Sequence, residues 1–139
     1  LICVKTYNIL KCSDYVHVYR GNSITAGKDE KGMKICLDQI STIEKWGRFF
    51  EKYTGNKELK AAMLSYLSYQ FFITMGKATT LEDEWRKNVE KKLKEIDFIV
   101  KYSIEKKQQK LSILYKVLGF RLTSRIVSFY YNKMRTRVR

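Results

Sequence analysis

Three polar residues of the segment YVHVYRGNSIT could together bind a phosphate group: Arg20, Ser23 and Thr25. A guanidinium is always charged and can form two parallel hydrogen bonds to a diphosphate, and hydroxyls beside it could donate more. The same residues have a simpler interpretation. Arg20 could form a surface pair with Asp14 or Asp29, and the hydroxyls could hold the turn that follows Arg20. The residues alone leave both interpretations open.

Residues that could bind a metal ion or act as acid and base are few. The three cysteines, which have no C-x-x-C spacing, are Cys3, Cys12 and Cys36, and the single histidine is His17. This count disfavours a zinc site and a disulfide framework, and it favours free buried thiols and a structural histidine. The carboxylates at 82–84 could hold a metal or form an acid–base pair. At the first turn of a predicted helix, complementing the helix dipole is the better explanation.

Two short motifs resemble the end of the catalytic domain in bacterial family 2 glycosyltransferases of the capsular and exopolysaccharide type. In that family a hydrophobic strand ends in Tyr-Arg, and a loop, Ser-Ile-Thr and a helical tail follow. Here Tyr-Arg stands at 19–20 and Ser-Ile-Thr at 23–25, with a spacer shorter than usual. The second motif, KVLGFRLTSRIVSFYYNKMR, is similar to the Gly-Phe-Arg/Lys-Leu-Thr-Ser ending of the same group.

The resemblance implies a parent enzyme that uses a nucleotide-sugar donor and a divalent metal, with Arg20, Ser23 and Thr25 at the donor phosphates. The chain has neither an Asp-x-Asp pair nor a Gly-rich phosphate loop, so we expect no catalytic residue, metal or cofactor in it. Because it begins at Leu1, we expect a fragment of a longer protein. Residues 1–30 would end a catalytic α/β domain, and residues 31–139 would form a C-terminal helical module.

The elements predicted to position these residues are one extended segment followed by helices. Alternating aromatic and β-branched residues predict a strand at 9–20, after a short apolar stretch at 1–4. Apolar residues at three- and four-residue intervals predict helices at 31–53, 57–75, 81–102, 111–118 and 122–134, the last two separated by a bend at Gly119. The predicted fold is therefore mainly α, a bundle of four or five helices with a short extended N-terminal segment.

Local signals predict how the helices begin, end and pack. Gly55 suits a left-handed cap, and Asn56 suits the start of the second helix. Thr80 and Asp83 form a capping-box pattern for the third helix, in which Glu90 and Lys94 are spaced to pair. Residues 61–76 carry no charge but are fewer than the roughly 20 that a membrane span requires, and they include polar side chains. We therefore expect a central helix that is buried on most sides.

The end of the chain carries most of its positive charge. Of the formal net charge of +14, residues 105–139 supply +9, from ten basic residues and one acid. Apolar residues are predicted to share one face of this tail: Leu111, Leu114, Tyr115, Leu118, Leu122, Ile126, Phe129 and Tyr130. This composition is typical of an interfacial helix on an anionic membrane. The residues predicted to contact the membrane are Lys116, Arg121, Arg125, Phe129, Tyr130, Lys133, Arg135, Arg137 and Arg139.

Several functions fit this pattern. The first is a helical module that supports a glycosyltransferase catalytic domain and attaches it to the inner face of the cell membrane. A basic nucleic-acid-binding protein is the second, although no zinc, RNP or helix-turn-helix signature is present. A plain protein-interaction module is the third. The tail itself could be a last bundle helix with solvated cations, or it could be divided, with residues 111–118 in the core and residues 122–139 at the membrane.

Overall fold

The computed structural model describes the backbone of residues 28–137 and the side chains of residues 28–130. The described part contains four α-helices and one 3-10 helix and no strand: α1 (Glu30–Lys52), α2 (Lys57–Ala78), α3 (Asp83–Glu95), η2 (Asp97–Tyr102) and α4 (Lys106–Arg137). The prediction of a mainly helical bundle is confirmed. The predicted strand at 9–20 lies outside the described residues, as do His17, Arg20, Ser23 and Thr25.

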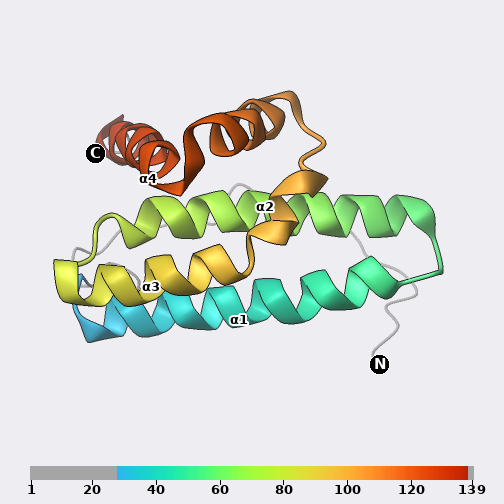
Figure 1. Cartoon of the computed structure of the whole chain (residues 1–139), viewed down its shortest axis with the longest axis horizontal. Coiled ribbons are helices and arrows are strands. Elements are labelled where there is room, and N and C mark those ends of the chain that lie inside the picture. Colours follow the sequence, from blue (N-terminus) through green and yellow to red (C-terminus); the bar gives the residue numbers. More distant parts are fainter. Residues whose placement is uncertain (1–27, 138–139) are drawn as a thin grey trace, which may run out of the picture.

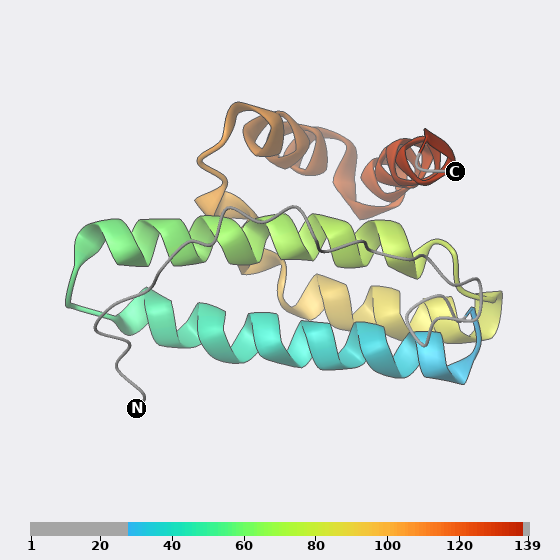
Figure 2. The same cartoon turned by 180° about the vertical axis from the view of Figure 1, so that it is seen from behind.

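The helices pack around α2. In Figure 1, α1 and α2 run antiparallel, α3 lies beside α1, and α4 lies across α2 on the side away from α1. Figure 2 shows the same order from behind. The 3-10 helix η2 leads from α3 to α4 and packs against α2. One apolar core joins all these elements, and its fully buried residues include Ile43, Phe71, Met75, Leu93 and Ile99.

Helix α2 is central, as its uncharged sequence predicted. Nine of its last twelve positions, 67–78, are buried, and its buried hydroxyls form hydrogen bonds within α2 or with later parts of the chain. Ser65 donates to Gln108 Oε1 at 3.2 Å, Ser68 shares a hydrogen bond with Ser103 at 2.8 Å, and Thr74 donates to the Gln70 carbonyl at 2.8 Å. Between residues 28 and 137, no helix combines the length and hydropathy needed to cross a bilayer.

The junction between α1 and α2 confirms one predicted cap and corrects another. Asn56 caps α2, because its Oδ1 accepts a hydrogen bond from the Leu59 amide at 3.0 Å. The left-handed cap predicted at Gly55 is wrong: Tyr53 ends α1 in an extended conformation, and among the described residues only Gly119 has a positive φ. Lys60 adds to this turn by donating to the carbonyls of Glu51 and Tyr53.

The third predicted helix, at 81–102, is wrong as a single element. Helix α3 ends at Glu95, and η2 carries the chain on to Tyr102. The 3-10 turn still buries Ile99 and Val100, so the apolar spacing does not reveal the change. Glu51 of α1 holds η2 by accepting hydrogen bonds from Lys101 and Tyr102. Partial burial opposes ionisation of Glu51, but those hydrogen bonds, together with the charges of Lys101 and Arg48, lower its pKa.

The start of α3 also differs from the prediction. Thr80 is not its cap, because the Thr80 hydroxyl donates to the Lys77 carbonyl at the end of α2, and Glu82 takes the N-cap position. The predicted pair of Glu90 with Lys94 is replaced by Arg86 with Glu90. The Lys94 ammonium lies 5.2 Å from the ring centroid of Phe120, so it connects α3 to α4 instead.

Candidate membrane-facing surface

Helix α4 has two limbs that meet at Gly119. Gly119 has φ 70° and ψ −178°, a conformation open to glycine but strained for other residues. The prediction of a bend at this residue is confirmed, and Figure 1 shows the two limbs running in different directions. Because the direction changes there, the sides that face the bundle must be found for each limb separately.

The first limb is fixed to the bundle by polar contacts as well as by apolar packing. Gln108 accepts from Ser65 of α2, and Ser112 donates to the Val100 carbonyl at 3.0 Å. The Tyr115 hydroxyl donates to Asp97 Oδ2 at 3.1 Å, and the Tyr115 ring meets Phe71 edge-on at 5.9 Å. Burial and the Asp97 carboxylate both raise the pKa of Tyr115, which keeps its hydroxyl a donor.

The second limb packs through one side as well. The residues buried on it recur at three- and four-residue intervals, which places them on a single side of the helix: Phe120, Thr123, Ser124 and Val127. Phe120 joins this side to α3 through Lys94 and to the first limb through Tyr115. Both limbs therefore have a side attached to the bundle and a side directed away from it.

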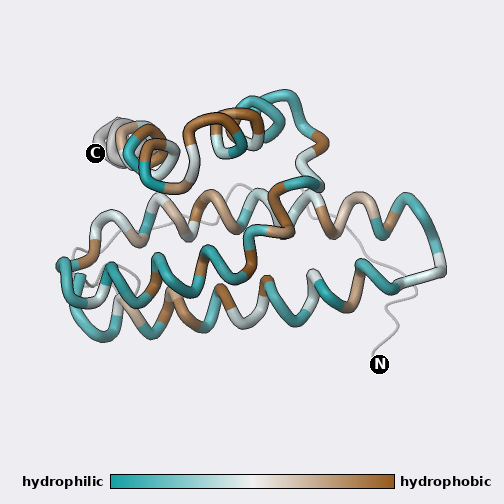
Figure 3. Tube along the Cα trace, viewed as in Figure 1, coloured by the Kyte–Doolittle hydropathy of each residue, from teal (hydrophilic) through white to brown (hydrophobic). Residues whose placement is uncertain are grey.

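The side of α4 directed away from the bundle combines exposed apolar and basic residues. Val117 is 75% exposed, and Phe129 is 66% exposed. We call the whole set the outward face of α4; its apolar members are Ile113, Val117, Leu118, Leu122, Phe129 and Tyr130, and its basic members are Lys110, Lys116, Arg121 and Arg125. None of these four cations forms an ion pair with a described residue. Figure 3 shows hydrophobic and hydrophilic positions following one another along α4.

The predicted apolar stripe is divided between the two sides. Leu111 and Tyr115 pack on the core, whereas Leu118, Leu122, Phe129 and Tyr130 are exposed. Ile113 and Val117, which are absent from the predicted stripe, lie one turn apart on the exposed side. Apolar spacing alone does not separate them from Leu111 and Tyr115, which pack on the core.

The other predicted site residues are placed as follows. Lys116, Arg121, Arg125, Phe129 and Tyr130 are all exposed on α4. Lys133, Arg135 and Arg137 belong to the backbone of α4, but their side chains lie outside the described part, and so does Arg139. The acids at 82–84 are exposed at the start of α3, and within residues 28–130 no three His, Cys, Asp or Glu side chains lie together as a metal site would require. Cys36 is a free buried thiol whose pKa is raised by burial despite the nearby Lys77 charge.

Gly119→Ala is expected to lower the free energy of unfolding by about 1–3 kcal/mol. A Cβ at this position would meet no atom within 4 Å, so the cost comes from the positive φ and not from crowding. Urea unfolding measures this change in the free energy of unfolding. Val117→Ala, a nearby exposed change, should stay within about 0.5 kcal/mol of the wild type. Equal stability of Gly119→Ala and the wild type would contradict the left-handed conformation.

Thr123→Val is expected to raise the free energy of unfolding by about 1 kcal/mol, since a buried polar atom without a partner is costly. The Thr123 hydroxyl is buried and has no hydrogen-bond partner among the residues that the structure describes. Helical threonines commonly donate to the carbonyl four residues earlier, which is Gly119, where the backbone is not helical. In contrast, Ser112→Ala removes a paired hydroxyl and should be destabilising. A loss of stability in Thr123→Val would show that its hydroxyl is paired.

Comparison of the chain with protein-family models, with curated proteins and with solved structures found no match.

Proposed function

We propose that this chain is a helical module that attaches its protein to an anionic membrane surface through the outward face of α4. One observation carries the proposal: exposed apolar side chains, and cations without an ion pair to any described residue, share the side of a helix whose other side is fixed to the bundle. Because the bundle already holds this helix in place, little backbone conformational entropy is lost when its outward residues bind a surface.

The two kinds of side chain contribute to binding in different ways. A basic residue near an anionic leaflet contributes about 1 kcal/mol, so the four described cations would supply about 4 kcal/mol. Apolar residues add roughly 25 cal/mol for each Å² that they withdraw from water. Peripheral membrane binding commonly depends on two such signals together. The side chains beyond residue 130 include four more cations in the sequence.

The resemblance in the sequence suggests which kind of protein is attached. We propose that the parent is a glycosyltransferase that transfers a sugar from a nucleotide-sugar donor to a polysaccharide or lipid-linked acceptor. Attachment at the inner face of the cell membrane would bring its catalytic domain to a lipid-linked acceptor. In this proposal Arg20, Ser23 and Thr25 contact the donor phosphates, and the metal and the nucleotide sugar are bound by residues outside this chain.

Nucleic-acid binding accounts for the outward face less well. Phosphate contacts need cations, whereas Ile113, Val117 and Leu122 would gain nothing from facing a phosphate backbone. Aromatic residues can stack on unpaired bases, but aliphatic residues occupy the middle of this face. The apolar residues therefore favour a lipid surface.

Co-sedimentation with vesicles tests the proposal. At about 0.15 M salt, where surface charges are screened beyond about 8 Å, the chain should bind phosphatidylcholine vesicles that contain phosphatidylserine and should bind pure phosphatidylcholine far less. Duplex and single-stranded DNA should bind more weakly than the anionic vesicles at the same salt. Tight DNA binding without vesicle binding would overturn the proposal.

A further inference from the structure

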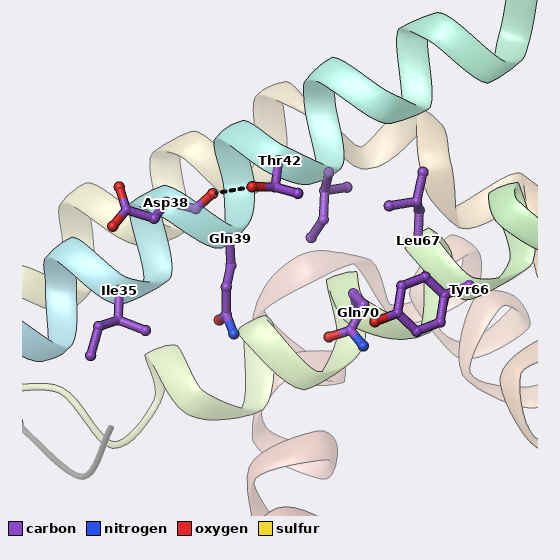
Figure 4. Close-up of a pocket in the computed structure, with 8 residues that line it drawn as sticks. Ile35, Asp38, Gln39, Thr42, Tyr66, Leu67 and Gln70 are labelled. Carbon is purple, nitrogen blue, oxygen red and sulfur yellow. Dashed lines mark hydrogen bonds between the residues drawn. The ribbon is translucent and has the colours of Figure 1, made fainter. Parts of the chain in front are cut away.

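A groove of about 350 Å³ lies between α1 and α2. In Figure 4, Ile35, Gln39 and Thr42 border it from α1, and Tyr66 and Gln70 border it from α2. The ribbons of α3 and α4 lie behind these two helices in that view. Its floor is apolar, because Ile43 and Leu67 are buried at its base.

Large aromatic side chains on the two helices that form the groove are half exposed. Tyr66 is 53% exposed at its edge, and Tyr69 lies one turn along the same helix. Trp46 and Phe49, one and two turns beyond Thr42 on α1, meet edge-on at 5.6 Å and are also exposed. Exposed aromatics gathered beside a groove are unusual for a surface that faces only water. These exposed aromatic residues therefore favour an apolar occupant for the groove.

The first 27 residues of the chain are connected at the correct place to reach this groove. They join the described part at Lys28, whose carbonyl accepts a hydrogen bond from the Glu82 amide at 3.1 Å. Ile35 lies only seven residues along α1 from Lys28, or about 10 Å at the helical rise. An extended chain spans about 3.3 Å per residue, so residues 15–19, which lie 9–13 positions before Lys28, are within reach of the groove.

The composition of that part of the chain matches the groove. Residues 15–19 alternate between aromatic and valine side chains, so either side of an extended segment would offer apolar groups. The segment 1–27 has three cations and one acid, and Asp38 at the groove has no ion pair with a described residue. A covalently connected segment also needs little intrinsic affinity, because its effective concentration is on the order of millimolar.

We infer that the groove between α1 and α2 binds residues 15–19 of the same chain, with the tyrosines against Ile35, Leu67 and Tyr66. The bundle would then hold the segment that leads into α1. This inference does not depend on membrane binding, because the groove and the outward face of α4 belong to different helices. Either one could fail while the other holds.

Hydrogen exchange of the full chain, followed by mass spectrometry, tests the inference. We expect amides of residues 15–19 to exchange at least tenfold more slowly in the wild type than in Tyr66→Glu, which places a charge at the edge of the groove. Thr42→Arg, which obstructs the groove from α1, should have the same effect. Ile113→Glu is the matched control, since Ile113 is similarly exposed but lies on α4, and it should leave the protection unchanged.

Protection of the α2 amides in each variant shows that the bundle is still folded. Faster exchange of residues 15–19 then reports loss of groove binding and not unfolding. Rapid exchange of residues 15–19 in the wild type would overturn the inference. So would slow exchange that survives both Tyr66→Glu and Thr42→Arg. A second copy of the chain is the alternative occupant, and sedimentation equilibrium tests it. If the wild type is a dimer that Tyr66→Glu converts to a monomer, the groove is a self-association surface, and the inference is overturned.

Discussion

Replacing Lys110, Lys116, Arg121 and Arg125 together by Gln is expected to weaken binding to vesicles that contain phosphatidylserine by up to about a thousandfold. The loss corresponds to about 1 kcal/mol for each cation near the anionic surface, or about 4 kcal/mol in total. The variant should keep its fold, because the four side chains are exposed and lack ion pairs within residues 28–130. Titration with vesicles at several salt concentrations measures the effect.

A matched control separates the position of the charges from their number. Lys45, Lys52, Lys87 and Lys91 are exposed on α1 and α3, and replacing all four by Gln changes the net charge equally. This control variant should bind the vesicles within a few-fold of the wild type. If both variants lost affinity to the same extent, net charge alone would explain binding, and α4 would have no special role.

Phe71→Ala is expected to lower the free energy of unfolding by about 3–5 kcal/mol, the usual cost of removing a buried aromatic ring. Phe71 is fully buried, meets Phe72 edge-on at 5.6 Å and meets Tyr115 at 5.9 Å. It therefore supports the contact between α2 and the first limb of α4. Since small domains have about 5–15 kcal/mol of stability in total, urea unfolding should show a large shift of the midpoint.

Tyr66→Ala is the control for this prediction, because it truncates an aromatic ring on the same helix where the ring is half exposed. Its cost should stay near or below about 1 kcal/mol. If Phe71→Ala were no more destabilising than Tyr66→Ala, the packing of α4 on α2 would be in doubt. The outward face would then lose the rigid support that the proposed function requires.

The sequence was sufficient to predict the helices that follow clear apolar periods with local caps. Helix α1 and helix α2 begin within one residue of their predicted starts, and Asn56 caps α2 as expected. The division of the third helix was not predictable, because Ile96, Ile99 and Val100 have the same spacing in an α-helix and in a 3-10 turn. No glycine or proline marks the change at Ile96.

The outward face of α4 was predicted in part, for a different reason. Polar residues such as Gln108, Ser112 and Thr123 suggest solvent in a sequence, yet they face the bundle and two of them pair across elements. Ile113 and Val117 suggest core, yet they are exposed. The side of a helix that packs depends on its partners, and several partners of α4 are hydroxyl and carbonyl groups that hydropathy does not detect.

The most direct test of membrane attachment is the environment of a fluorescent label on the outward face of α4. Cys3→Ser and Cys12→Ser remove two of the three thiols, and the third, Cys36, is fully buried. A label therefore attaches to an introduced cysteine, either at Val117 or, as the control, at exposed Lys91. Vesicles that contain phosphatidylserine should shift the emission of the Val117→Cys label to shorter wavelength and leave the Lys91→Cys label unchanged. A shift at position 91 without one at position 117, or no shift at either position under conditions of vesicle binding, would contradict attachment through α4.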